Sequence, residues 1–208
     1  MKGKIECIKR LQLSNDDKGI RTMVYMFGCP MKCKYCVNPG AKEKGNYNKL
    51  SADDLADMLQ VNALYFRATG GGITFTGCEP LMQAEFIKEV IQKLPGYYNF
   101  AVETSLAVPF RKIKILAPYI DTFYVDIKSL DSDEYKKHTG KKPKLVYGNL
   151  EKLKNLVDPR KIEVRVPVLS SYVGYRNREQ QIGTLLKMGF TNIKEFNYQI
   201  RPPQDFDI

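Results

Sequence analysis

Six short runs rich in β-branched and aromatic residues alternate with amphipathic stretches, and this alternation restricts the fold more than any other feature of the sequence. The runs span residues 22–27, 73–76, 100–104, 122–126, 162–168 and 193–198. Apolar residues at helical spacing lie between them, as at Phe86, Ile87, Val90 and Ile91. Strands that alternate with helices form parallel sheets through right-handed crossovers. The pattern therefore predicts an α/β fold whose parallel sheet is either open and doubly wound or a partial barrel.

The chain is expected to fold as one domain over residues 1–208. Its 208 residues are enough to bury one substantial core, and no internal repeat or low-complexity tract divides them. The clearest helix start is at Ser51, which has the capping-box spacing with Asp54 and precedes an apolar stripe at Leu55, Met58 and Leu59. We therefore expect a helix to begin directly after Ser51.

Composition argues against several classes of protein. No apolar run approaches the roughly 20 residues of a membrane span, and the first ten residues lack the apolar core of a signal peptide. We therefore expect a cytoplasmic protein without a membrane segment. The formal net charge is +10, from 33 Lys and Arg against 23 Asp and Glu. The densest basic run, 136–144, is interpreted as a solvated loop after a helix, and no nucleic-acid motif makes nucleic acid an expected partner.

Three of the five cysteines, Cys29, Cys33 and Cys36, fall within eight positions. An odd number of cysteines without an export signal is more typical of metal ligands than of disulfides. A structural zinc site normally takes four ligands, and the only histidine, His138, is expected on a helix surface. Iron–sulfur clusters also commonly take four thiolates, so three predict a cluster with one open iron. The alternative is a degenerate zinc site that borrows another cysteine.

Polar residues follow the predicted strands at the points where they end. Gly77–Pro80, Glu103–Thr104 and Asp126–Lys128 come after three successive runs, and the cysteines follow the first run. In parallel α/β folds, functional groups gather at the carboxyl ends of the strands. These residues are therefore expected to form one site.

The cysteine spacing C-x₃-C-x₂-C, with an aromatic residue before the last cysteine, resembles the signature of the radical S-adenosylmethionine superfamily. The flanking segments DDKGIRT at 16–22 and CVNP at 36–39 resemble DGPGIRT and CHNP of the glycyl-radical-enzyme activating enzymes. GGGITFTGCEPL at 70–81 is similar to their GGGVTFSGGEPL. The resemblance continues through Glu103-Thr104, Asp126-Ile127-Lys128, Thr139-Gly140 and Arg165, so it covers most of the chain.

This resemblance implies a partial barrel of six β/α units, one of the two folds that the strand pattern leaves open. It also implies a [4Fe–4S] cluster whose open iron chelates S-adenosylmethionine. In such enzymes one electron cleaves S-adenosylmethionine to methionine and a 5′-deoxyadenosyl radical, which removes a hydrogen from a backbone glycine of a partner. The implied protein is an anaerobic oxidoreductase that activates a glycyl-radical enzyme, with a flavodoxin- or ferredoxin-type electron donor.

The resemblance also assigns residues. It gives the cluster to Cys29, Cys33 and Cys36, and contact with the incoming peptide to Asp16. The implied cofactor-binding residues are Tyr35, Gly77, Cys78, Glu79, Glu103, Thr104, Asp126, Lys128, Arg165 and Gln199. A monovalent cation is implied beside the acidic strand ends. Simpler interpretations remain for four of these residues: a helix N-terminal acid for Glu79, surface salt bridges for Lys128 and Arg165, and a turn residue for Asp16.

The sequence departs from the family pattern at three positions. Cys78 replaces the second glycine of GGEP, Val37 replaces a histidine, and Gln199 stands where the family tends to have histidine. No cysteine-rich insert follows the first run, which indicates a minimal form without a ferredoxin-like insert. Two other functions stay open: a radical S-adenosylmethionine enzyme that modifies a peptide, RNA or small molecule, and a non-catalytic metal-binding or electron-transfer module.

Overall fold

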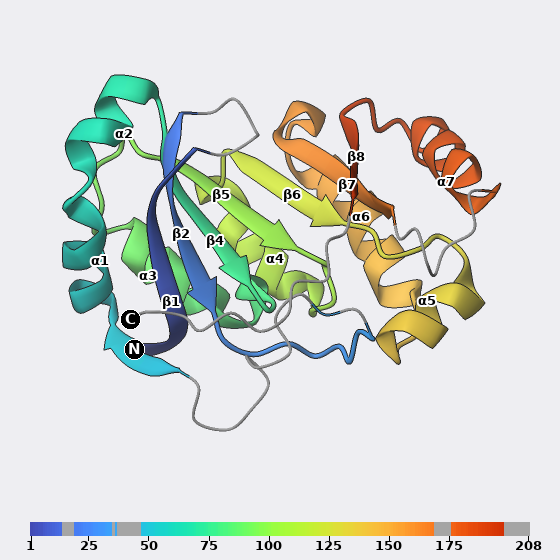
Figure 1. Ribbon diagram of the computed structural model, residues 1–208, viewed down its shortest axis with the longest axis horizontal. Helices are drawn as coiled ribbons and strands as arrows, with labels where there is room; N and C mark the ends of the chain where they lie inside the picture. Colours follow the sequence, from blue (N-terminus) through green and yellow to red (C-terminus); the bar gives the residue numbers. More distant parts are fainter. Residues whose placement is uncertain (14–18, 35, 37–46, 169–175, 198–208) are drawn as a thin grey trace.

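The computed structural model describes residues 1–13, 19–34, 36, 47–168 and 176–197. Within these residues, an eight-stranded sheet forms the centre of the molecule, in the order β3-β1-β2-β4-β5-β6-β7-β8 (Figure 1). The strands are β1 Lys2–Leu13, β2 Ile20–Met26, β3 Asn48–Ser51, β4 Gly72–Gly77, β5 Asn99–Thr104, β6 Thr122–Asp126, β7 Ile162–Val168 and β8 Ile193–Asn197.

All six strands predicted from the sequence are present as β2 and β4–β8, and each pairs in parallel with the next. Their bounds differ from the predicted ones by at most two residues at either end. The sequence did not predict β1 and β3, which extend the sheet by antiparallel pairing beside β2. The second half of β1 is half-buried or exposed, so it lacks the continuous apolar run by which the other strands were identified.

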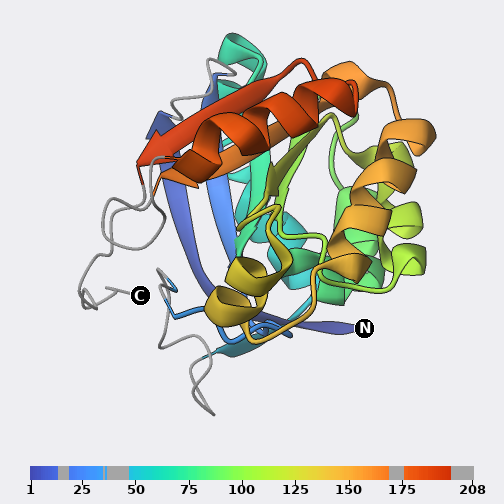
Figure 2. The same ribbon diagram turned by 90° about the vertical axis from the view of Figure 1, so that its right-hand side faces the viewer.

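Helices connect the strands of the sheet. They are α1 Ala52–Gln60, α2 Ala63–Thr69, α3 Ala84–Ile91, α4 Phe110–Leu116, α5 Ser132–Thr139, α6 Lys144–Leu156 and α7 Arg176–Lys187, with short 3₁₀ turns η2 Pro80–Gln83, η3 Ala117–Tyr119 and η4 Pro159–Lys161. Figure 2 shows α3, α4 and α6 side by side against the curved sheet. The curvature confirms the α/β fold and favours the partial barrel over the doubly wound sheet.

The predicted capping box at the start of α1 is confirmed. The Ser51 hydroxyl accepts a hydrogen bond from the Asp54 backbone N–H at 3.1 Å, and the Asp54 carboxylate accepts one from the Ser51 N–H at 3.1 Å. Two backbone donors that have no partner within the helix are thereby satisfied. The helix consequently begins at the residue that the sequence indicated.

The two faces of the sheet differ in chemistry. One face carries fully buried apolar side chains that pack in the core, namely Val24, Phe75, Val102, Val125 and Val164. Successive side chains of a strand point to opposite faces, so the other face carries the alternate residues. Those residues include Thr76, Glu103, Tyr124, Asp126 and Arg165. The inner face of the partial barrel is therefore polar toward the carboxyl ends of its strands.

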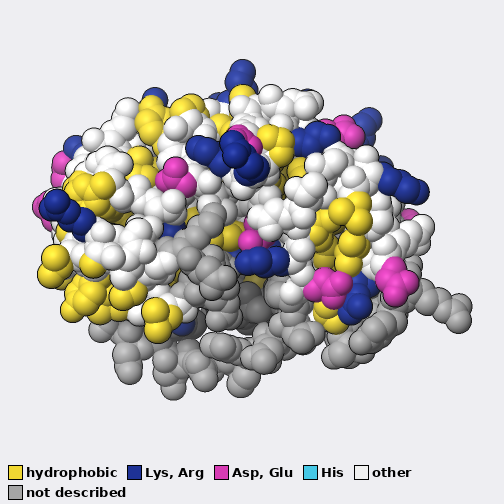
Figure 3. Space-filling model, turned by 90° about the horizontal axis from the view of Figure 1, so that it is seen from above, with side chains coloured by type: hydrophobic (Ala, Val, Ile, Leu, Met, Phe, Trp, Pro, Cys, Tyr) yellow, Lys and Arg dark blue, Asp and Glu magenta, His cyan; other side chains and the backbone are white. Residues whose placement is uncertain are grey.

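Exposed apolar side chains gather at the end of the molecule formed by α1 and α2, as the left side of Figure 3 shows. Met58, Val61, Leu64 and Tyr65 are 36–76% exposed there. Across the described part of the chain, none of the helices has the length and apolarity needed to cross a membrane.

Candidate active site

The cysteine loop leaves the carboxyl end of β2 and is held to the neighbouring strand end. The Cys78 N–H donates to the Met26 carbonyl at 3.1 Å, and the Glu79 N–H donates to the Gly28 carbonyl at 3.0 Å. Gly28 has a φ of +103°, a conformation that residues with a Cβ rarely adopt. These contacts place the first cysteine, Cys29, beside the end of β4, as expected for residues that follow neighbouring parallel strands.

The end of α5 supports the same loop from the other side. The Lys32 N–H donates to the Thr139 carbonyl at 3.0 Å, and the Lys34 N–H donates to the His138 carbonyl at 2.9 Å. The Tyr135 hydroxyl lies 3.4 Å from the Met31 sulfur. Two backbone hydrogen bonds and one side-chain contact therefore join segments about a hundred residues apart in the sequence.

Two expectations about this region were wrong. His138 is not on a helix surface but 1% exposed, because α5 packs its last turn against the core and the cysteine loop. Burial lowers the pKa of His138. The basic run 136–144 is not one loop: it spans the last turn of α5, the left-handed residue Gly140 and the first residue of α6.

The three cysteines of the loop form no disulfide among the described residues and are half-buried, and Cys29 and Cys33 pack against the hydrophobic core. Burial, together with the nearby Glu79, Cys78 and Cys33, raises the pKa of the Cys29 thiol to about 12, although a backbone hydrogen bond at Met31 opposes the increase. Coordination to a metal deprotonates such thiols. Among the described residues, no three Cys, His, Asp or Glu side chains are gathered closely enough to hold a metal ion. The donor set, three thiols of one loop that includes Tyr35, nevertheless fits an iron–sulfur cluster in ligand type.

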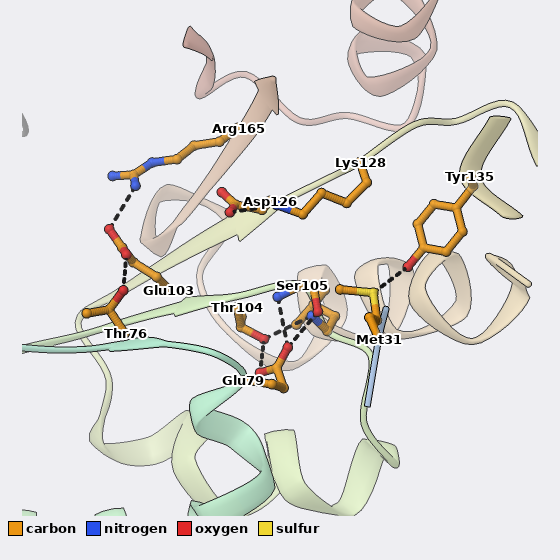
Figure 4. A network of polar contacts seen from close by, with 11 residues as sticks. Met31, Thr76, Glu79, Glu103, Thr104, Ser105, Asp126, Lys128, Tyr135 and Arg165 are labelled. Atoms are coloured by element: carbon orange, nitrogen blue, oxygen red, sulfur yellow. Dashed lines mark hydrogen bonds and ion pairs between the residues drawn. The ribbon is translucent and has the colours of Figure 1, made fainter. Parts of the chain in front are cut away.

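Glu79 ties the ends of β4 and β5 together (Figure 4). Its carboxylate is fully buried and accepts hydrogen bonds from the Thr104 hydroxyl at 2.6 Å, from the Ser105 hydroxyl at 2.6 Å and from the Ser105 N–H at 3.0 Å. It also caps η2 by accepting from the Leu81 N–H at 3.3 Å. Burial raises the pKa of Glu79, and the hydrogen bonds oppose that shift. The interpretation as a helix N-terminal acid is therefore correct in part, since the same carboxylate also bridges two strand ends.

Gly77 is required by the close approach of β2 and β4. Its φ is +98°, and a Cβ on this residue would lie 2.8 Å from both the N and the O of Met26. Any larger residue would have to displace backbone. The strand end can therefore turn into the Cys78–Glu79 segment only with glycine here.

A second polar network crosses the inner face of the sheet (Figure 4). The Thr76 hydroxyl donates to Glu103, and the other Glu103 oxygen lies 2.9 Å from Arg165 Nη1. Arg165 also pairs with Glu163 at 3.0 Å, and its guanidinium lies 4.0 Å from the ring centroid of Tyr124. Burial raises the pKa of Glu103, whereas Arg165 and Thr76 oppose the increase. The network links the four strands from β4 to β7.

Asp126 and Lys128 complete the row at the end of β6. Their charged groups are 3.2 Å apart, and the Lys128 side chain is 8% exposed. β4, β5, β6 and β7 are neighbours in the sheet, so the predicted residues of these strands form one row across the carboxyl-terminal side of the sheet. The row consists of Gly77, Cys78, Glu79, Glu103, Thr104, Asp126, Lys128 and Arg165. Asp16, Tyr35 and Gln199 lie outside the described residues.

Sequence reasoning missed four residues that contribute to these networks, namely Thr76, Ser105, Tyr124 and Glu163. Tyr124 lies within an apolar run, so nothing marked it as functional, whereas Glu163 lies two positions before the predicted residue Arg165 and its charge in a buried strand could have been a signal. Ser105 directly follows the predicted pair Glu103–Thr104, and its position could have been a signal.

Comparison with known proteins finds one matching family and similar enzymes. Residues 23–183 match the Radical SAM superfamily. The chain is 35% identical over 141 residues to the pyruvate formate-lyase-activating enzyme of Clostridium pasteurianum, covering 67% of this chain and 58% of that protein. It is 27% identical over 246 aligned residues to the 4-hydroxyphenylacetate decarboxylase activating enzyme of Clostridioides difficile (strain 630), covering 88% of this chain and 77% of that protein.

The fold also resembles that of a solved structure. The crystal structure of Streptococcus suis SuiB bound to S-adenosylmethionine matches 82% of this chain and 38% of that protein, with a TM-score of 0.65 and 16% sequence identity. This likeness concerns the fold alone.

Proposed function

Because the chain belongs to the radical S-adenosylmethionine superfamily, we propose that it activates a glycyl-radical enzyme by removing a hydrogen atom from one glycine of that partner. Support comes from the two relatives named as activating enzymes. The chain spans 58% of the length of the first and 77% of the second, so the activity of the whole relatives is carried over here as a proposal.

The superfamily uses a [4Fe–4S] cluster and S-adenosylmethionine. We propose that Cys29, Cys33 and Cys36 hold the cluster. When bound, it supplies the single electron that cleaves S-adenosylmethionine to methionine and a 5′-deoxyadenosyl radical. The other residues of this chain orient the cofactor and admit the substrate.

The polar row at the ends of β4–β7 is the observation that carries the proposal. A module that only held a cluster or passed on electrons would gain nothing from it. Lys128 and Arg165 offer cations to the carboxylate of S-adenosylmethionine, and Asp126 and Glu103 offer acceptors to its ammonium and hydroxyl groups. Burial makes these contacts stronger than they would be in water.

Glu79 has a different proposed role. All four of its hydrogen bonds come from the protein itself. We propose that it holds the Gly77–Cys78 backbone in place, so that the carbonyls there can accept from the cofactor ammonium. Thr104 acts through Glu79 in the same way. A monovalent cation beside Glu103 and Asp126 stays a prediction. Such a cation would compete with Arg165, which already pairs with the Glu103 carboxylate.

The proposed substrate is an extended loop of the partner. Among the described strands the sheet begins at β3 and ends at β8, and these two edges do not pair with each other. Such a lateral opening suits a loop that enters from another protein. It stays a prediction that Asp16 contacts that loop and that Tyr35 and Gln199 contact the cofactor. The electron donor is proposed to be of flavodoxin or ferredoxin type. The proposed location is the cytoplasm, because five cysteines without a disulfide among the described residues favour a reducing compartment.

Electron paramagnetic resonance tests this function. The anaerobic, reconstituted protein is mixed with dithionite, S-adenosylmethionine and a candidate glycyl-radical enzyme. A persistent protein radical split by one α-hydrogen is the expected signal. Cleavage of S-adenosylmethionine without any such radical, across candidate partners, would favour an enzyme that modifies a peptide, RNA or small molecule.

A further inference from the structure

A group of exposed lysines surrounds the cysteine loop at the end of α5. Lys32 and Lys34 come from the loop itself, between and beside its cysteines. The others come from the end of α5 and the segment that follows it. We call the set Lys32, Lys34, Lys136, Lys137, Lys141 and Lys142 the lysine surface; all six are exposed.

The two segments that carry the lysine surface are in direct contact. The backbone N–H groups of Lys32 and Lys34 donate to α5 carbonyls, as described above. A Cβ on Gly140 would lie 3.9 Å from the Cβ of Lys32. Figures 1 and 2 show α5 and the loop side by side from two directions. Glu134, Lys137 and Lys34 all act electrostatically on His138, so charges from α5 and from the loop meet at this residue. The six charges therefore belong to one surface.

The six lysines outnumber the three carboxylates of α5 and its cap. In the described part of the chain, none of the six lysines forms an ion pair within 4 Å. The carboxylates of α5 lie at its other end, where Asp131 caps the helix and Asp133 and Glu134 occupy the first turn. Like charges held close together repel, and they attract a partner of opposite charge.

We propose that the lysine surface docks an acidic protein that delivers one electron to the cluster. The inference rests on the proposed function, because it requires the cluster held by Cys29, Cys33 and Cys36. One electron passes from the donor, which is oxidised, to the cluster, which is reduced; no bond is formed or broken. Lys32 and Lys34 flank Cys33 in the sequence, so a donor seated on them lies beside the proposed cluster.

Two further observations favour this occupant over the glycyl-radical partner. The polar groups proposed to hold S-adenosylmethionine lie on the inner face of the partial barrel, whereas the lysine surface is exposed to solvent around α5. The surface also consists of two short segments, and the six described residues that define it are all lysines. Transient redox encounters use small, charged interfaces of this kind and gain mainly a faster association from electrostatic steering.

The test uses the full chain with its cluster and a triple variant, K136Q/K141Q/K142Q. Reduced flavodoxin with a net negative charge is the donor, and loss of visible cluster absorbance in stopped flow reports reduction at low ionic strength. We expect the second-order rate constant to fall by about tenfold in the variant, since steering changes on-rates by 10- to 1,000-fold. Added salt should slow the wild type and affect the variant much less.

The matched control is K114Q/K152Q/K187Q, which removes the same charge from exposed lysines of α4, α6 and α7. Its rate constant should stay within about twofold of wild type, because the removed charges lie away from the proposed docking site. Equal losses in both triple variants would mean that only net charge matters, and unchanged rates in the first would mean that the donor docks elsewhere; either result overturns the proposal.

Dithionite separates docking from the cluster and from the glycyl-radical partner. It should reduce the first triple variant at the wild-type rate. If glycyl-radical formation driven by dithionite is slower in this variant, the lysine surface serves the protein substrate and the proposal is wrong. The reduction assay contains no glycyl-radical enzyme, so failure of the proposed activation leaves its result interpretable.

Discussion

Replacing Arg165 by Met tests the polar network on the inner face more sharply than any other single change. Arg165 pairs with Glu103 at 2.9 Å and with Glu163 at 3.0 Å, and its side chain is only 18% exposed. Met keeps much of the apolar stem but removes both ion pairs. Glu163 retains Lys194 at 3.1 Å, so the loss falls mainly on Glu103.

The size of the effect follows from the contacts. Hydrogen bonds to charged groups each contribute about 1.5–3 kcal/mol, and breaking a buried pair leaves an uncompensated charge. Two such contacts would give about 3–6 kcal/mol. The side chain of Glu103 is 26% exposed, which lets water replace part of the interaction. We therefore expect Arg165→Met to lower the free energy of unfolding by about 2–4 kcal/mol at pH 7.

The loss should also depend on pH. Burial raises the pKa of Glu103, and Arg165 opposes that increase. Removing Arg165 therefore raises the pKa further. A carboxyl group whose pKa is raised by folding favours the folded state below its unfolded pKa, and this contribution is lost as the pH rises through the folded pKa. The difference between wild type and Arg165→Met should therefore be larger at pH 8 than at pH 5.

Urea unfolding of the apo-protein under reducing conditions measures this difference at both pH values. Arg165→Lys is the matched control, because it keeps one charge near Glu103 and should recover part of the stability. A loss below about 0.5 kcal/mol, the range of ordinary surface substitutions, would refute the reasoning. So would a difference that shrinks between pH 5 and pH 8.

Three smaller changes test other parts of the structure. Cys29→Ala should abolish the broad iron–sulfur absorbance, whereas Cys7→Ala should leave the iron content near wild type; iron loss in Cys7→Ala would contradict the three-ligand assignment. Gly77→Ala should cost at least about 1–2 kcal/mol in urea unfolding from its positive φ alone, plus the contact with Met26, and an unchanged midpoint would contradict the structure there. Ser51→Ala should lower stability by about 1 kcal/mol through loss of the α1 cap, with Ser51→Asn close to wild type.

The sequence predicted those features that depend on neighbouring residues. The parallel strands are short apolar runs, and the α1 cap is a contact between Ser51 and Asp54, three positions apart. β1 and β3 escaped prediction because strands that are largely half-buried or exposed carry no continuous apolar signal. Motifs likewise located the site residues at the strand ends, whereas composition and spacing alone left zinc and iron–sulfur ligation open.

Contacts between distant segments could not be predicted. The Met31–Tyr135 contact spans 104 positions, and Glu79 meets Ser105 across 26. Only the folded chain reveals that α5 supports the cysteine loop and that its last turn is consequently buried. His138 was assigned to the surface for this reason: its neighbours Lys136 and Lys137 read as solvated, while its contacts come from a loop far back in the sequence.

Transfer of deuterium from a glycine tests the central claim most directly. A candidate glycyl-radical enzyme is prepared with deuterated glycine and incubated anaerobically with this protein, a reductant and S-adenosylmethionine. Mass spectrometry then measures the isotope content of the 5′-deoxyadenosine formed. The account predicts one deuterium per activated glycine, together with collapse of the α-hydrogen splitting in the radical spectrum. If the 5′-deoxyadenosine acquires its hydrogen from a peptide, RNA or metabolite and never from the partner's glycine, the activating function is contradicted.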